Sequence, residues 1–188
     1  MRHDAMNDAS DETSVDFLDL ADGTLYFDEA PVPGVDALIA EAAALYGEPE
    51  AEARLLRAYF LAPEQLSVIV ALYRYYFYQH RLDDTLIVAE RAIALAARRL
   101  GLPADIAQIG LEALARIEPA QRPLLRFHLL AAKGSVIVLL RLGRHAEARA
   151  RLATLVQLDS RDQLDVKPLL DVVADALGDS LPLLSTAA

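Results

Sequence analysis

LSVIVALYRYYFYQHRLDDTLIVAERAIALAARR, residues 66–99, is the stretch that decides the fold. Apolar residues recur three and four positions apart on both sides of a break at His80–Arg81, and this is the spacing of an α-helix. The part before the break is apolar almost all round, so we expect it to lie at the centre of the fold. The stretch therefore predicts a hairpin of two helices, over 63–79 and 83–100.

Outside this hairpin, helical spacing continues along the chain, and proline and glycine punctuate it. The further helices are predicted at 35–46, 48–63, 104–118, 120–142, 144–158 and 162–177. β-branched and aromatic residues are too few and too clustered for a sheet. The sequence therefore predicts an all-α fold of about three helical hairpins, with an inserted helix and a C-terminal capping helix.

Charge divides the chain into an arm and a domain. Residues 1–30 carry nine acidic residues against one arginine, and they hold most of the net charge of −10. We interpret 1–30 as an acidic, largely disordered arm, 31–178 as the helical repeat domain, and 179–188 as a frayed tail. Spaced hydrophobic residues interrupt the acids of 15–29, which gives the arm the chemistry to dock on a protein surface.

Several functional classes are excluded by composition. The absence of cysteine excludes disulfides and thiolate metal sites, and it fits a reducing cytoplasm. No uncharged apolar run of about 18 residues predicts a membrane span, and the N-terminus lacks a signal pattern, so we expect a cytoplasmic protein that does not bind membranes. Neither part of the chain offers the basic face that nucleic acid requires.

Motifs for catalysis are equally lacking. No two of the four histidines stand at helical spacing, and His80 and His145 lie in the breaks between helices, where turn geometry explains them. Glycine-rich phosphate loops and nucleophile elbows are absent. The sequence therefore predicts no catalytic residue, no metal and no cofactor, and we expect a protein that is not an enzyme.

A repeat underlies the helix pairs. HRLDDTLIVAERAIAL (80–95) and GRHAEARARLATLVQL (143–158) align without gaps. Three frames of 34 residues start at Val32, Leu66 and Leu129, and an insertion, 100–128, precedes the third. In the second frame the large positions hold Ile69, Leu72, Tyr76 and Leu82, and two of the small positions hold Thr85 and Ala92. Here the chain resembles the tetratricopeptide repeat family, whose unit is a helix-turn-helix of this length.

A second resemblance rests on the aromatic run itself. LYRYYFYQHRLDD, with the later ARRLGLP, resembles small bacterial helical repeat proteins that are encoded beside nitrogen-fixation genes. Seven of the twelve aromatic residues lie between Tyr59 and Tyr78. Tyr73 and Tyr76 fit the core, but side chains at successive helix positions cannot all face inward. Some of these aromatic side chains should therefore reach a groove, where exposed aromatics beside arginine are typical anchors for a partner.

The tetratricopeptide resemblance implies a concave groove lined by the first helix of each unit. It places Val70, Arg74 and Phe77 on the groove, with Lys133 and Ile137 from the third unit, and the aromatic argument adds Tyr78. Arg74 and Lys133 would meet a carboxylate, although both also fit ordinary helix-surface charges.

The leading prediction is a non-catalytic protein–protein interaction module, an adaptor or assembly factor that binds a peptide or helix in this groove. Its own acidic arm is a candidate occupant. One alternative is a homodimeric structural or regulatory protein, and another is a small-molecule sensor or enzyme, which would need a closed pocket with convergent polar groups.

Overall fold

The fold comes from a computed structural model that describes residues 29–159, 164 and 166–177. Every regular element in this part of the chain is helical, which confirms the all-α class. The helices are α1 (Val35–Ala44), α2 (Pro49–Leu61), α3 (Leu66–Tyr78), α4 (Leu82–Leu100), α5 (Leu111–Ala115), α6 (Arg122–Arg141), α7 (His145–Leu158) and α8 (Lys167–Leu177). Short 3-10 turns at Ile106–Gln108 and Pro119–Gln121 flank α5. Nearly all of the predicted arm and the whole of the tail 179–188 lie outside the described residues.

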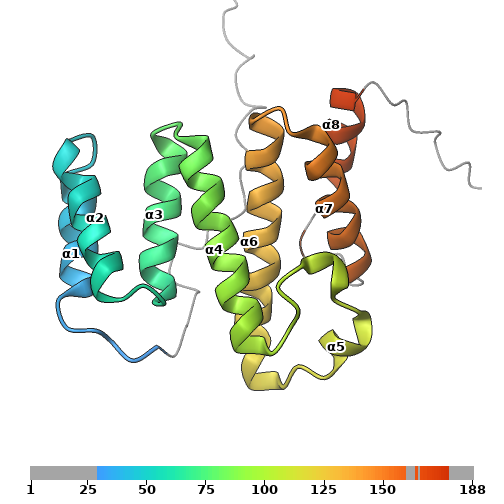
Figure 1. The fold of residues 1–188 in the computed structure, drawn as a ribbon, viewed down its shortest axis with the longest axis horizontal. Helices are drawn as coiled ribbons and strands as arrows, with labels where there is room; N and C mark the ends of the chain where they lie inside the picture. Colours follow the sequence, from blue (N-terminus) through green and yellow to red (C-terminus); the bar gives the residue numbers. More distant parts are fainter. Residues whose placement is uncertain (1–28, 160–163, 165, 178–188) are drawn as a thin grey trace, which may run out of the picture.

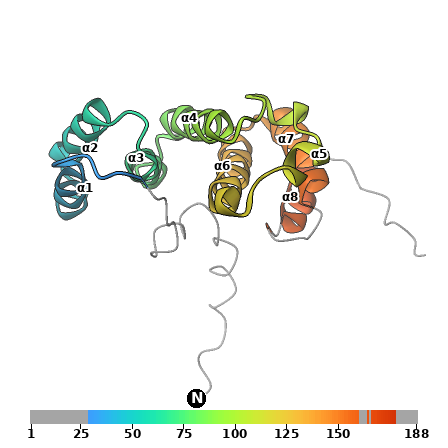
Figure 2. The same ribbon diagram turned by 90° about the horizontal axis from the view of Figure 1, so that it is seen from below.

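Consecutive helices pack as antiparallel pairs that stand side by side in a row (Figures 1 and 2). The pairs are α1 with α2, α3 with α4, and α6 with α7. Between the second and third pair, α4 packs directly against α6, and the insertion that carries α5 lies to one side. The last helix, α8, packs against α7 at the end of the row, as expected for a cap.

Two apolar cores share one helix, α3. Its Leu66, Ile69 and Tyr73 belong to the larger core with α4, α6 and α7. Residues on another side of α3, Val68 and Leu72 among them, belong to the smaller core with α1 and α2. The expected central place of this helix is therefore confirmed, because both cores need one of its faces.

Three of the helices end in the same type of turn. His80, Gly101 and Gly143 follow α3, α4 and α6 with φ of 57°, 66° and 72°. After α3, the Arg81 N–H donates to the Tyr76 carbonyl at 2.9 Å, and Arg144 makes the same bond to Leu139 after α6, which is the pattern of a Schellman cap. His80 thus corresponds in the repeat to Gly143 and not to His145, the first residue of α7.

The start of α3 is fixed by a residue far away in the sequence. Helix α3 begins at Leu66, three residues later than predicted, and it has no acid in its first turn and no side-chain cap from Gln65. Instead both carboxylate oxygens of Glu29 accept the Leu66 N–H, at 2.9 and 3.2 Å. Arg99, at the end of α4, pairs with the same carboxylate. One glutamate therefore ties the segment before α1 to both helices of the second pair.

The helix α6 and the turn before it, Pro119–Arg141, are long and apolar enough to cross a membrane by length and composition alone. No such helix was expected, because the sequence holds no uncharged apolar run of about 18 residues. In the fold, 61% of the apolar window is buried inside the protein, because α4 and α7 cover opposite sides of α6. A central helix in a stack of hairpins needs the same apolar character as a membrane span, so this feature is explained by its packing.

Candidate functional site

An apolar groove of about 430 Å³ lies between α1 and α3. Its walls are Ile39, Ala42, Ala43 and Tyr46 from the first helix and the turn after it, Leu55 from α2, and Ala71, Arg74, Tyr75 and Tyr78 from α3. Three of these lining residues, Ala42, Ala43 and Ala71, are alanines, whose short side chains leave room between the two helices. The groove therefore exists because α1 packs mainly on α2 and leaves this side of α3 uncovered.

Tyrosines form much of the groove. Tyr46 and Tyr78 are 55% and 46% exposed, whereas Tyr75 is half-buried and contacts the Tyr76 ring edge-on with centroids 5.6 Å apart. Burial raises the pKa of the Tyr75 hydroxyl, and the charge of Glu52 raises it further. This hydroxyl therefore stays protonated at neutral pH and can donate a hydrogen bond to a ligand.

Arg74 is the cation of the groove. Its side chain is half-buried, and it makes no hydrogen bond or ion pair with any part of the chain that the structure describes. The nearby Arg81 is different, because it pairs with Glu52 at 2.7 Å and Asp84 at 2.8 Å and covers the Tyr76 ring. A guanidinium without such partners, beside apolar and aromatic side chains, is suited to bind a carboxylate.

Phe77 packs next to the groove lining and is not part of it. Its ring stacks on Tyr73 with centroids 5.9 Å apart and contacts Tyr78 edge-on at the same distance. The Arg141 guanidinium covers Phe77 at 4.9 Å from the ring centroid. Phe77 therefore packs against Tyr78, a residue of the groove lining, and its own ring is covered by Arg141.

The six residues predicted from the sequence do not form one site. Arg74 and Tyr78 line the groove, and Phe77 lies next to it. Val70 is buried in the larger core, and Ile137 is half-buried on α6, outside the groove lining. Lys133 is only 4% exposed, and its Nζ donates to the Leu164 carbonyl at 2.6 Å. The ammonium of Lys133 thus anchors the segment before α8 and does not face the groove.

Sequence reasoning missed the wall that α1 contributes. Ile39, Ala43 and Tyr46 stand at i, i+4 and i+7, so they form a second apolar row beside the buried row of Leu38 and Ala42. That row was visible in the sequence. The helix that this row faces could not be predicted, because the packing of α1 against α3 cannot be read from either helix alone.

No metal-binding chemistry accompanies the groove. None of its lining residues is His, Asp or Glu, and no cluster of three such residues occurs among the residues that the structure describes. The lining, with Arg74 and three tyrosine hydroxyls among apolar side chains, can hold apolar groups and one anionic group.

Comparison with known proteins gives one informative match. The chain is 42% identical over 161 residues to an uncharacterized 19.8 kDa protein in the nifW 5′ region of Azotobacter chroococcum mcd 1. The alignment covers 86% of this chain and 90% of that protein. The chain belongs to the family of this Azotobacter protein.

This membership bears out the resemblance to small bacterial proteins encoded beside nitrogen-fixation genes. No family model matches the chain, so the tetratricopeptide resemblance gains no support of that kind. No solved structure matches it either.

Proposed function

We propose that the chain is a non-catalytic, cytoplasmic interaction module, an adaptor or assembly factor built as a tetratricopeptide-like array, which binds a segment of another protein in the α1–α3 groove. The bound segment carries an acidic residue that pairs with Arg74 and apolar side chains that fill the space between Ile39 and Tyr78. The Azotobacter relative lies in the nifW 5′ region, which directs the search for the partner to nitrogen-fixation proteins of the host.

The observation that carries this proposal is the guanidinium of Arg74, which makes no hydrogen bond or ion pair with the described residues and lies in an otherwise apolar, tyrosine-rich groove. Half-burying a charge without a partner costs free energy, and a carboxylate ligand removes that cost. Tyrosine and arginine are also the residues that most often dominate binding energy at protein interfaces. Tyr46 and Tyr78 of its lining are exposed, so a polypeptide segment can reach them from solvent.

A charge exchange tests the proposal. On an array of peptides with one acidic residue flanked by leucines, we expect wild-type protein to bind acidic peptides at least ten-fold more tightly than the matching lysine peptides. Arg74→Glu should reverse this preference, because the half-buried carboxylate at position 74 then pairs with the lysine of the peptide. Calorimetry with the best peptide gives the dissociation constants.

Arg57→Glu is the matched control, since Arg57 is an exposed arginine on α2 that does not line the groove. It should leave both peptide affinities unchanged. If Arg74→Glu and wild-type protein show the same peptide preference, Arg74 does not recognise the ligand and the proposal fails.

A homodimer is the second candidate, and a specific surface favours it. On the outer face of α2, Leu56 and Phe60 are 46% and 86% exposed and stand one turn apart. An apolar pair of this kind suits a self-complementary interface. Analytical ultracentrifugation of wild-type protein and Phe60→Ser distinguishes the two functions, because a dimer through α2 should dissociate in the variant while peptide binding in the groove persists.

A further inference from the structure

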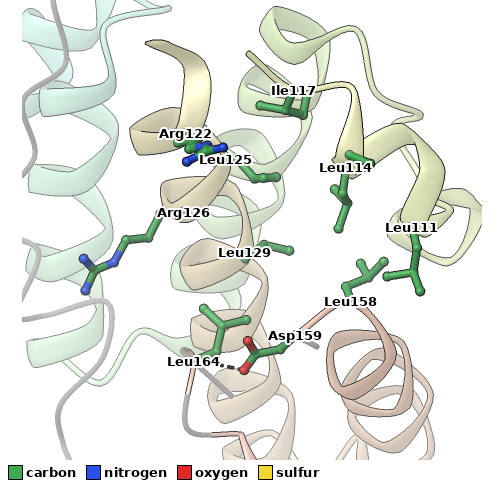
Figure 3. A pocket seen from close by; sticks show the side chains of 11 residues that line it. Leu111, Leu114, Ile117, Arg122, Leu125, Arg126, Leu129, Leu158, Asp159 and Leu164 are labelled. Carbon is green, nitrogen blue, oxygen red and sulfur yellow. Dashed lines mark hydrogen bonds between the residues drawn. The ribbon is translucent and has the colours of Figure 1, made fainter. Parts of the chain in front are cut away.

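A second and larger cavity, of about 810 Å³, lies at the opposite end of the row of helices. Figure 3 shows Leu114 of α5 and Ile117 reaching toward the space beside Leu125 and Leu129 of α6. Leu158, at the end of α7, closes it from below. All of the large apolar side chains in the lining are aliphatic, and none is aromatic. This recess therefore differs in chemistry from the tyrosine-rich groove between α1 and α3.

The charges of the recess lie at its ends. Arg122 lies beside Ile117 at one end, and Arg126 follows one turn later with its guanidinium directed away from the leucines (Figure 3). Neither arginine makes a hydrogen bond or ion pair within the described part of the chain. At the other end, the Asp159 carboxylate accepts the Leu164 N–H at 2.8 Å. An anionic ligand in this aliphatic space should place its negative group at the arginine end, because the carboxylate at the other end repels it.

The two arginines also repel each other, because like charges at i and i+4 on a helix destabilise it. They stand in the first turns of α6, where the helix dipole disfavours cations, and no acid occupies that first turn. A ligand anion at Arg122 relieves both effects. The cavity supplies the place for the rest of that ligand.

We propose that this recess binds a free, single-chain fatty carboxylate, with its head at Arg122 and its aliphatic chain running along Leu125 and Leu129 toward Leu158. An alkyl chain needs no hydrogen-bond partner along its length, and the large apolar side chains between Arg122 and Asp159 are leucine and isoleucine. A peptide backbone would bring polar groups into that lining, and a ligand with several acids would meet Asp159. The charge pattern therefore favours one anionic head on an aliphatic chain.

Calorimetry of the full chain with octanoate, decanoate and dodecanoate, each below its micelle concentration, tests the proposal. We expect one saturable site and an affinity that rises about four-fold for each methylene that becomes buried. Decanol and decyltrimethylammonium should bind at least ten-fold more weakly than decanoate, because they lack the anionic head. Butyrate should not bind measurably.

Variants assign the site. Arg122→Glu should weaken decanoate binding at least ten-fold, and Arg126→Glu should weaken it less because its guanidinium points away. Both place an acid near the start of α6, where acids favour a helix, so circular dichroism should show an intact fold. Ala115→Phe should block the recess, since Ala115 is an exposed residue of its lining.

Arg57→Glu and Ala107→Phe are matched controls, because both residues are exposed and lie outside the lining. They should bind decanoate like wild-type protein, and so should Arg74→Glu, which separates this site from the proposed peptide groove. The proposal is overturned if decanol and decyltrimethylammonium bind as tightly as decanoate, or if the control variants lose as much decanoate affinity as Arg122→Glu. Binding of the protein to anionic vesicles without binding of free decanoate would also overturn it. Absence of decanoate binding together with capture of a partner helix that Arg122→Glu abolishes would overturn it in favour of a protein ligand.

Discussion

His128 is the most unusual single residue of the fold. It is completely buried on α6, and its Nδ1 lies 3.1 Å from the Ile93 carbonyl of α4. Since a carbonyl only accepts, Nδ1 carries the proton, and the buried Nε2 has no hydrogen-bond partner among the described residues. Burial lowers the pKa of His128 to about 4, against a smaller opposing effect of the Ile93 bond. The neutral ring is therefore part of the core between the second and third helix pairs.

This lowered pKa predicts the direction of a pH effect on stability. The unfolded chain binds a proton at His128 below about pH 6.5, whereas the folded chain does so only near the lowered pKa. The stabilisation is fully present above about pH 6.5 and falls as the pH drops toward the lowered pKa. The free energy of unfolding should decrease by about 2 kcal/mol between pH 7 and pH 5. Urea denaturation at the two pH values measures it.

His128→Gln serves as the comparison, because glutamine keeps a donor for the Ile93 carbonyl and does not titrate. Its stability should change much less over the same interval, in which exposed carboxylates stay ionised. Equal pH dependence in the variant and the wild-type protein would show that His128 is not the group responsible.

At the scale of the element, the second hairpin depends on a residue outside it. Glu29 accepts the first N–H of α3 and pairs with Arg99 at the end of α4. The cap thus acts across 37 residues of sequence, and it explains how a helix with no local capping residue begins where it does. A deletion meant to test the acidic arm should therefore stop at residue 28, because removing residues 29–30 also uncaps α3.

Glu29→Ala should lower the free energy of unfolding by about 1 kcal/mol, the usual cost of losing a helix cap. Denaturant unfolding followed by circular dichroism measures this change. Glu41→Ala is the control, since it removes only an exposed ion pair with Arg54 and should cost less than about 0.5 kcal/mol. An equal effect of the two substitutions would mean that the Leu66 N–H gains nothing from Glu29.

The helices were predictable because each carries its own apolar period. Helices α1 to α4, α6 and α7 lie within about three residues of their expected ends, and the largest of these differences, at the start of α3, has a tertiary cause. The predicted start at Pro63 missed the turn that Arg91 and Arg99 hold through the carbonyls of Pro63 and Glu64. Local pattern identifies a helix, but a contact from another element decides where that helix begins.

The candidate site was predictable only in part, for the same reason. Arg74 could be placed on a groove from its position in the 34-residue frame, and Tyr78 because a helix that is apolar all round must expose some of its aromatics. Lys133 was misplaced because its acceptor, the Leu164 carbonyl, lies 31 residues later in the chain. A lysine on a helix is expected at the surface, and only the packed fold reveals a buried acceptor for it.

For the whole molecule, the stacked arrangement predicts uneven stability. The pair α1–α2 reaches the rest of the fold chiefly through α3 and the smaller core, whereas α4 and α6 lie inside the larger one. In a stack, each unit depends on its neighbours, and an end unit has only one. We therefore expect α1 and α2 to open locally at a lower free energy than α4 and α6.

Native-state hydrogen exchange measured by mass spectrometry tests this expectation. Peptides from α1 and α2 should exchange at least ten-fold faster than peptides from α4 and α6. A groove ligand should slow the first set selectively, because its binding site includes α1. Uniform exchange across all four helices would instead indicate one cooperative unit.

The apolar length of α6 has a consequence for how the chain is made. Pro119–Arg141 leaves the ribosome before α7 does, so for a time this helix lacks α7 and has α4 as its main cover. During that interval the nascent segment has the length and hydropathy that targeting factors recognise in membrane proteins. A gene truncated after Arg141 should therefore yield an insoluble or mislocalised product, and the residues that follow act during synthesis as the cover that keeps this helix inside the protein.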